Sequence, residues 1–223
     1  MKSTILLLTV LLLISCSKEN GEFDNGKTYY RFSNLDYNLI LKYNYQPNQI
    51  ITYKNQFGGH LRFKVISNIL KKEGQYSGNF GWGGSTLDYY YDNKLIKFEL
   101  LELNSSYRDN LIIYNFTKSE GIFKNAINLP IWNVTSNSFY DEIDRPLNVR
   151  LIPHNNKPYI EANINGHLFK KVVLINSDST IPLGPYYGGA LNRGINQLYY
   201  DYDFGIIQFN DINGMEWKLI YPQ

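Results

Sequence analysis

The sequence predicts an all-β domain, either an antiparallel sandwich or a partly open barrel of about twelve strands, with almost no helix after residue 16. Short runs of alternating apolar and polar residues recur along the chain, and Gly, Asn or Asp residues bound them. Aromatic residues make up 16 % of the chain and include 20 tyrosines, and tyrosine favours half-buried pleated surfaces. Beyond residue 16, no segment shows the sustained 3.6-residue period of an amphipathic helix.

The predicted strands follow one another at the short spacing that is typical of a sandwich or barrel. In chain order they are Thr28–Phe32, Gln49–Gln56, His60–Ile69, Leu87–Tyr91, Leu95–Leu103, Leu111–Phe116, Leu147–Ile152, Tyr159–Ile164, His167–Ile175, Gln197–Tyr202, Ile206–Asn210 and Met215–Tyr221.

The segments between these strands divide into tight turns and longer loops. Asp92–Lys94 predicts a tight turn, whereas Lys71–Thr86, Lys118–Arg145 and Asn176–Asn196 predict irregular segments. The best helical candidate is the single turn Ser138–Asp141, which has a serine cap and an acidic residue three positions later. Because functional side chains concentrate on loops held by a rigid scaffold, the long segments are where a site is expected.

The register of the last hairpin can be predicted from its apolar residues. A three-residue loop, Ile212–Gly214, pairs Phe209 with Trp217 and Ile207 with Leu219, and so keeps one face of the hairpin apolar. The same argument applied to a loop at Phe57–Gly59 pairs Tyr53 with Phe63 and Ile51 with Val65.

A third hairpin is predicted to turn at Asn165-Gly166. This dipeptide is typical of a two-residue type I′ turn, because both central residues need a positive φ. The turn would place Glu161 opposite Lys170 and Tyr159 opposite Val172.

The first sixteen residues form a secretory signal. Lys2 is followed by an apolar run from Ile5 to Ile14, and Ser15 precedes Cys16, the single cysteine of the chain. The run is ten residues long, whereas a membrane-spanning helix needs about 20. An uncleaved anchor or an ordinary signal peptide with an incidental cysteine are the alternatives.

Leu13-Ile14-Ser15-Cys16 resembles the lipobox of bacterial lipoproteins. The resemblance implies that residues 1–15 are cleaved and that Cys16 carries acyl chains, which anchor the protein to a membrane. Residues 16–26 are polar and without periodicity, which predicts a flexible tether, and residues 27–223 then form a single β domain. Ser17 stands where the inner-membrane retention signal of such proteins has aspartate, so the resemblance implies the outer membrane, on its periplasmic or cell-surface face.

Composition excludes several function classes. The net charge of +2 falls to +1 without residues 1–15, because Lys2 is their only charged residue. A near-neutral chain with scattered basic residues lacks the electrostatic footprint of a nucleic-acid-binding protein. A thiol used for lipidation leaves no cysteine for a disulfide, a metal or a nucleophile.

The C-terminal stretch Tyr199–Trp217, with its Tyr-Tyr, Gly, Phe, Asp, Gly and Trp residues, resembles the ending of many uncharacterised Bacteroidetes lipoproteins. This resemblance implies a lineage and an all-β domain, and it carries no catalytic residues with it.

No motif predicts a catalytic residue, a metal or a cofactor. His60 and His167 fall at hairpin positions and His154 lies in a loop, none with metal-ligand spacing. Asp201 and Asp203 share one face of a strand. A glycoside hydrolase could use any two well-placed carboxylates, Asp141 and Glu142 included, but sequence does not give their separation. Asp211–Gly214 fails the ligand pattern of an EF-hand and is better explained as a turn.

Glycine-flanked aromatic residues are the candidates for ligand binding. Trp82 lies in Gly78–Ser85, and Tyr186-Tyr187 precede Gly188-Gly189. Exposed rings of this kind stack on sugar rings, whereas buried ones would only plug the end of a sandwich or barrel. The sequence therefore favours a non-enzymatic lipoprotein that binds a ligand or partner, with a glycan as the specific candidate. A structural or assembly lipoprotein of the envelope and a carboxylate-dependent glycoside hydrolase are the alternatives.

Overall fold

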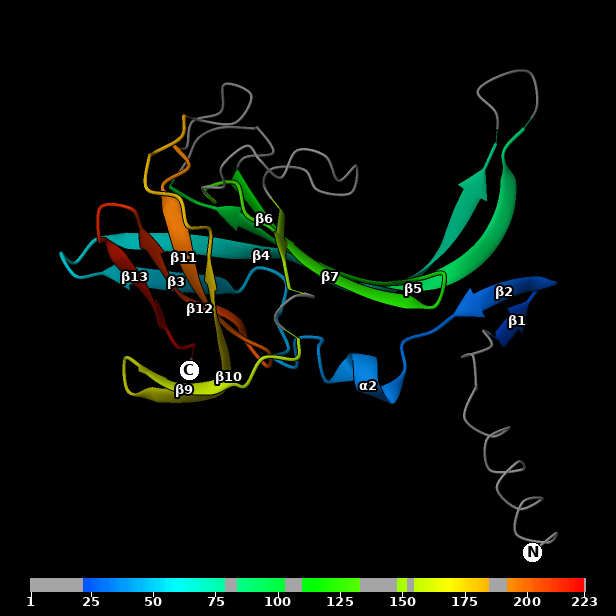
Figure 1. The fold of residues 1–223 in the computed structure, drawn as a ribbon, viewed down its shortest axis with the longest axis horizontal. Helices are drawn as coiled ribbons and strands as arrows, with labels where there is room; N and C mark the ends of the chain where they lie inside the picture. Colours follow the sequence, from blue (N-terminus) through cyan, green and yellow to red (C-terminus); the bar gives the residue numbers. More distant parts are fainter. Residues whose placement is uncertain are drawn as a thin grey trace, which may run out of the picture.

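The structure is a computed structural model that describes residues 22–78, 84–102, 110–132, 148–151, 155–184 and 192–222. It confirms the all-β fold class (Figure 1). In the described part of the chain, α2 (Asn34–Tyr37) is the one helix, and no helix has the length and apolar character of a membrane span. The strands are β1 (Glu22–Asp24), β2 (Lys27–Tyr30), β3 (Ile50–Asn55), β4 (His60–Ser77), β5 (Thr86–Leu100), β6 (Leu111–Ser119), β7 (Ile122–Asn128), β8 (Asn148–Arg150), β9 (Ile160–Ile164), β10 (His167–Asn176), β11 (Ile195–Asp201), β12 (Gly205–Asp211) and β13 (Glu216–Ile220).

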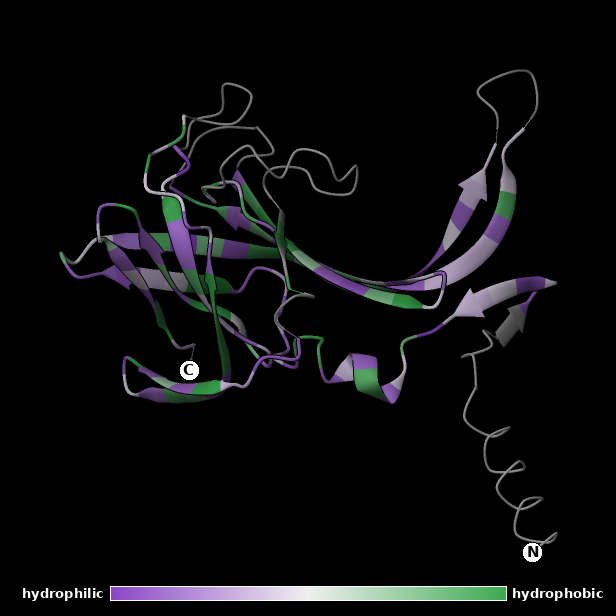
Figure 2. Cartoon of the chain, viewed as in Figure 1, coloured by the Kyte–Doolittle hydropathy of each residue, from purple (hydrophilic) through white to green (hydrophobic). Residues whose placement is uncertain are grey.

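All the described strands belong to one sheet, with the order β8-β7-β6-β5-β4-β3-β13-β12-β11-β10-β9 along its main path. Neighbouring strands are antiparallel, except that β2 runs parallel to β5. The two end strands, β8 and β9, do not pair with each other, so the described strands do not close into a barrel. Figure 2 shows polar and apolar bands alternating along the strands, as expected when one face of a sheet is buried.

The sheet curls so that distant strands face each other across one core. Tyr114 of β6 contacts the ring of Tyr200 in β11 at 6.4 Å between centroids, although five strands separate β6 from β11 in the sheet order. Both rings are buried. The arrangement is therefore like a sandwich, although a single sheet supplies both layers.

The last hairpin has the predicted register, with Phe209 opposite Trp217. The side chain of Asp211 shapes its loop, because Oδ1 accepts hydrogen bonds from the backbone N–H of Asn213 at 2.8 Å and of Met215 at 2.9 Å. Gly214 has a φ of +79°, the left-handed conformation that closes a three-residue loop. The turn explanation of Asp211–Gly214 is confirmed.

The predicted register of the β3–β4 hairpin is wrong by two residues: Tyr53 pairs with Leu61, not with Phe63. Asn55 causes the difference, because its Oδ1 accepts hydrogen bonds from the backbone N–H of Phe57 at 3.0 Å and of Gly59 at 2.7 Å. The loop thus begins one residue earlier than predicted and repeats the design of the Asp211 loop. A shift of two residues keeps the same side chains in the core.

The Asn165-Gly166 turn forms as predicted, with φ values of +49° and +85°. A bulge between Phe169 and Val172 then shifts the register, so that Val172 faces Ile160. The predicted pairing of Val172 with Tyr159 is wrong for this reason.

The tight turn predicted at Asp92–Lys94 is absent, because β5 runs through it without a break. The carboxylate of Asp92 is buried and accepts hydrogen bonds from the Tyr29 hydroxyl at 2.6 Å and from the Phe32 backbone N–H at 2.9 Å. Since tertiary partners satisfy the side chain of Asp92, it no longer favours a turn. The irregular segment predicted from residue 71 likewise begins as strand, and β4 continues to Ser77.

These two long strands form an extension of the sheet, here called the arm. The arm consists of β1, β2 and the outer parts of β4 (Ser67–Ser77) and β5 (Thr86–Asn93), and Figure 1 shows it projecting from the body that holds β9 to β13. Its first hairpin begins at Glu22, so residues 22–26 belong to β1 and its turn rather than to the predicted tether.

Helix α2 was not predicted, although its signal lies in the sequence. Ser33 and Asp36 form a capping box in which the Asp36 carboxylate accepts a hydrogen bond from the Ser33 backbone N–H at 2.7 Å. The same carboxylate forms an ion pair with Lys118 Nζ at 2.9 Å, and both side chains are less than one-tenth exposed. The helix is therefore tied to the end of β6. The helical turn predicted at Ser138–Asp141 lies outside the described residues.

Buried tyrosines hold the start of β12. Ile207 is an extra residue in the β11–β12 ladder, where Tyr199 faces Gln208 and Tyr200 faces Ile206. At this bulge the Ile206 backbone N–H donates to the Tyr114 hydroxyl at 3.1 Å, and the Tyr53 hydroxyl donates to the Ile206 carbonyl at 2.8 Å. Tyrosine hydroxyls thus replace ladder hydrogen bonds inside the core.

The Tyr200 hydroxyl is the exception, since it is buried without a hydrogen-bond partner among the described residues. Burial raises its pKa well above the usual value, so the group stays protonated. We expect Tyr200→Phe to leave the free energy of unfolding unchanged or to raise it by about 1 kcal/mol, because a desolvated hydroxyl is removed. The matched control, Tyr114→Phe, should lower it by about 1–3 kcal/mol, because the Ile206 N–H loses its acceptor. Urea unfolding measures the free energy of unfolding of both variants. An equal decrease in the two would contradict the assignment of a hydrogen-bonded Tyr114 hydroxyl and an unpaired Tyr200 hydroxyl.

Candidate functional site

The ligand-binding residues predicted from sequence, Trp82, Tyr186 and Tyr187, lie outside the described residues, as does Cys16. Their roles stay predictions. The described part of the chain offers a different site.

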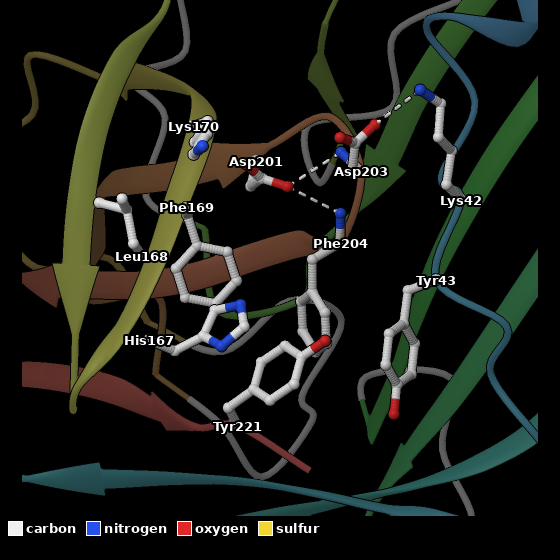
Figure 3. Close-up of a pocket in the computed structure, with 10 residues that line it drawn as sticks. All are labelled: Lys42, Tyr43, His167, Leu168, Phe169, Lys170, Asp201, Asp203, Phe204 and Tyr221. Atoms are coloured by element: carbon white, nitrogen blue, oxygen red, sulfur yellow. Dashed lines mark hydrogen bonds and ion pairs between the residues drawn. The ribbon is translucent and has the colours of Figure 1, made fainter. Parts of the chain in front are cut away.

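A pocket of about 370 Å³ opens beside the β11–β12 turn, and it is called the His167 pocket here (Figure 3). Its volume lies at the lower end of the range for small-molecule sites. Segments from four parts of the chain line it: Lys42, Tyr43, His167, Leu168, Phe169, Lys170, Asp201, Asp203, Phe204 and Tyr221.

The shape of the β11–β12 turn depends on Asp201, whose side chain is 3 % exposed. Its Oδ1 accepts hydrogen bonds from the backbone N–H groups of Asp203 and Phe204, both at 2.9 Å (Figure 3). Its Oδ2 accepts one from the Lys171 N–H at 3.1 Å. Three backbone donors thus engage this carboxylate, which fixes the turn on which Asp203 and Phe204 stand.

The rim of the pocket is charged. Asp203 Oδ1 lies 3.2 Å from Lys42 Nζ and 3.0 Å from Lys171 Nζ. The backbone carbonyl of Asp203 also accepts hydrogen bonds from the N–H groups of Lys42 and Tyr43, at 2.9 and 2.8 Å. The segment after α2 is therefore bound to the β11–β12 turn, while the charged side chains remain partly exposed for a ligand.

Aromatic rings form the wall of the pocket. His167 stacks on Tyr221 with 3.7 Å between ring centroids and 6° between ring planes. Phe169 packs 4.6 Å from His167, and Tyr43 packs 4.7 Å from Phe204. Burial, together with Tyr43 and Asp201, raises the pKa of Tyr221, so its hydroxyl is a neutral donor at physiological pH. Figure 3 shows these rings gathered below the Asp201 turn.

This arrangement joins flat apolar rings to hydrogen-bonding charges within one opening. It suits a ligand that has an apolar face and polar edges. Asp201 and Asp203, noted in the sequence as a same-face pair, are indeed brought to one site. Asp201 accepts three backbone hydrogen bonds, and Asp203 is shared by two lysines.

The sequence singled out His167 only as a hairpin histidine, and it gave no sign of Lys42, Tyr43 or Tyr221. These residues come together through strand pairing between distant segments, so no local motif marks them. Within the described ranges, no group of three or more His, Cys, Asp or Glu residues could hold a metal ion.

Comparison with protein-family models, with curated proteins and with solved structures finds no match to this chain.

Proposed function

We propose that this chain is an outer-membrane lipoprotein, anchored through acyl chains on Cys16, that binds a glycan without chemically altering it. The lipobox motif supports the anchor, and the His167 pocket supports the binding. The observation that carries the binding proposal is the stacked wall of His167 and Tyr221 beside the charged pair of Lys42 and Asp203.

A sugar ring has an apolar face of C–H groups and an edge of hydroxyls. The aromatic wall can pack against the face, as aromatic rings pack against other flat apolar surfaces. Lysine donors and carboxylate acceptors on the rim can pair with the hydroxyls, because partly exposed charged groups form strong hydrogen bonds. Neither interaction requires a reaction at the bound ligand.

The carboxylates of the pocket favour binding over hydrolysis. A glycoside hydrolase needs one carboxylic acid to donate a proton and a second carboxylate to act as base or nucleophile. Both oxygens of Asp201 accept backbone hydrogen bonds that shape the turn, and Asp203 Oδ1 lies beside two ammonium groups. These contacts give both carboxylates partners within the protein itself, which supports a structural role for them.

A glycan array probed with the purified protein tests the proposal, and His167→Ala is the main variant. We expect this substitution to weaken binding of the selected glycan about tenfold, which corresponds to about 1.4 kcal/mol, because the stacked wall loses one ring. The measurement is the dissociation constant by calorimetry.

His60→Ala provides the matched control, since His60 is an exposed histidine at the β3–β4 turn and outside the pocket. It should leave affinity unchanged. Absence of binding by the wild type, or equal weakening in both variants, would contradict the proposal. Trp82→Ala on the same array tests the surface predicted from sequence: a loss in this variant alone would assign binding to the Trp82 segment instead.

A further inference from the structure

The described part of the chain begins at the arm, where strand pairing holds its first residues in place. β1 pairs with β2 through Asp24 and Lys27, and β2 pairs with β5 through Thr28 and Tyr89. Asp24 also forms an ion pair with Lys72 of β4. These contacts hold Glu22, the first described residue, against the arm.

Six residue steps separate Glu22 from Cys16. A fully extended chain spans at most about 3.3–3.6 Å per residue, so the connection reaches about 20 Å at most. If Cys16 carries the lipid anchor, the start of β1 stays within about 20 Å of the bilayer surface. This distance is shorter than the hydrocarbon core of a bilayer, which is about 30 Å thick.

One face of the arm carries exposed side chains that suit a membrane surface. Leu70, Lys72 and Tyr76 are separated by even numbers of residues on β4, so they lie on the same face. Lys72 forms an ion pair with Asp24, so this is also the face that the Asp24 side chain of the edge strand β1 reaches, and it is called the Lys72 face here. Leu70 is 51 % exposed and Tyr76 is 57 % exposed.

Tyrosine rings surround the same lysine. Lys72 Nζ lies 3.7 Å from the ring centroid of Tyr90 and 5.1 Å from that of Tyr29. Tyr29 in turn donates its hydroxyl hydrogen bond to the buried Asp92. The face therefore combines tyrosine rings, exposed apolar side chains and a lysine whose charge is balanced by Asp24.

From this geometry we propose that the Lys72 face of the arm lies on the lipid bilayer, with Leu70 and Tyr76 at the level of the headgroups. The inference depends on the proposed anchor at Cys16, and it adds an orientation that the anchor alone does not give. Tyrosine is enriched where membrane meets water, because its ring is apolar and its hydroxyl is polar. The His167 pocket is built from the body of the domain, and Figure 1 shows the arm and the β9–β10 hairpin at opposite sides. Contact through the arm therefore leaves the pocket open to large ligands.

The charge balance of this face determines how the contact responds to salt and lipid. The Lys72–Asp24 pair is neutral, so this pair adds little attraction to anionic lipid. Binding through ring and apolar contacts is also insensitive to salt, unlike binding through a polybasic patch. We expect the contact to form on zwitterionic phosphatidylcholine vesicles as well as on vesicles with added phosphatidylglycerol.

The experiment uses the full chain, expressed with lipidation and reconstituted into such vesicles. Because the lipidated Cys16 no longer has a free thiol, one introduced cysteine is the single site for an environment-sensitive fluorophore. The test sites are Leu70→Cys and Tyr76→Cys. Ile69→Cys is the matched control, because Ile69 is 49 % exposed and lies on the opposite face of the same strand. Phe57→Cys marks the far end of the body.

Headgroup-labelled quencher lipids should quench the fluorophore at positions 70 and 76 at least about twofold more than at positions 69 and 57, because only the first face enters the interface. Equal quenching at positions 69 and 70 would overturn the orientation. A second outcome would also overturn the orientation: the fluorophore at position 70 is shielded from an aqueous quencher, but the lipid quencher does not reach it. That outcome would indicate a protein partner on this face.

Failure of the anchor itself is detected separately. The wild-type protein, which has Cys16 alone, should not react with a thiol reagent and should remain with the vesicles. If Cys16 reacts, the proposed anchor is wrong. If Cys16 is blocked but positions 70 and 76 are not quenched, the anchor stands and the membrane-facing arm is wrong.

Discussion

Replacing Lys118 by methionine is expected to destabilise the domain by about 3–5 kcal/mol, because the carboxylate of Asp36 then remains buried without its cation. Lys118 Nζ lies 2.9 Å from Asp36 Oδ2, and the two side chains are 7 % and 8 % exposed. An isolated charge in such a place cannot recover its lost hydration. For a domain of this size the melting temperature should fall by about 6–20 °C, at about 2–4 °C for each kcal/mol.

A second variant separates the charge from the packing. Asp36→Asn keeps an acceptor for the Ser33 backbone N–H but removes the negative charge. The double variant Lys118→Met/Asp36→Asn should therefore recover a large part of the loss, since replacing both members of a buried pair costs less than removing one. Urea unfolding of the two single variants and the double variant measures the coupling. A loss below about 1 kcal/mol for Lys118→Met, similar to that of an exposed ion pair, would contradict the proposed burial.

Gly205→Ala is expected to cost about 3 kcal/mol or more, through backbone strain and a steric conflict at one position. Gly205 has a φ of +112°, which L residues with a side chain rarely adopt. A Cβ at this position would lie 3.0 Å from the Tyr114 hydroxyl oxygen and 3.2 Å from its Cζ atom. The same hydroxyl accepts the hydrogen bond of Ile206, so the added methyl group also disturbs the tyrosines that hold β12.

The matched control for this variant is Gly58→Ala. Gly58 has a φ of +87°, but a Cβ added there would meet no atom within 4 Å, so its substitution reports strain without contact. We expect a loss of about 1 kcal/mol there. The difference between the two losses, measured by thermal unfolding, isolates the conflict with Tyr114. Equal losses would show that the space around Gly205 adjusts without cost.

The fold class could be predicted from sequence because alternation and turn residues are local signals. The Asp211 loop illustrates this, since apolar alternation fixed the pairing of Phe209 with Trp217. The Asn55 loop shows the limit of the same reasoning: Gly58 and Gly59 are equally able to adopt a positive φ, and only the hydrogen bonds of the Asn55 side chain decide between them. The turn predicted at Asp92 is wrong because the deciding contacts are distant in sequence. An aspartate favours a turn locally, but here Tyr29 and Phe32 bind its carboxylate and keep it within a strand.

The His167 pocket could not be predicted, because its residues have no sequence relationship. Lys42 meets Asp203 across 161 positions of the chain, and His167 meets Tyr221 only because β10 and the segment after β13 lie side by side. Carboxylates at Asp201 and Asp203 were visible in sequence, but their roles depend on the backbone donors and lysines around them. Local patterns identify strands, whereas a site built by the curl of a sheet appears only once the strand order is known.

The strand order also determines when this protein can fold. β13, the last of the described strands, pairs with β3 on one side and with β12 on the other. Until Glu216–Ile220 has been synthesised, both neighbours present an unpaired edge, which is a template for aggregation. Ribosomal synthesis proceeds from the N-terminus, so the strands made first wait for those made last. The main path of the described sheet is therefore completed only once β13 has been made, and before that stage its unpaired edges can pair with other chains.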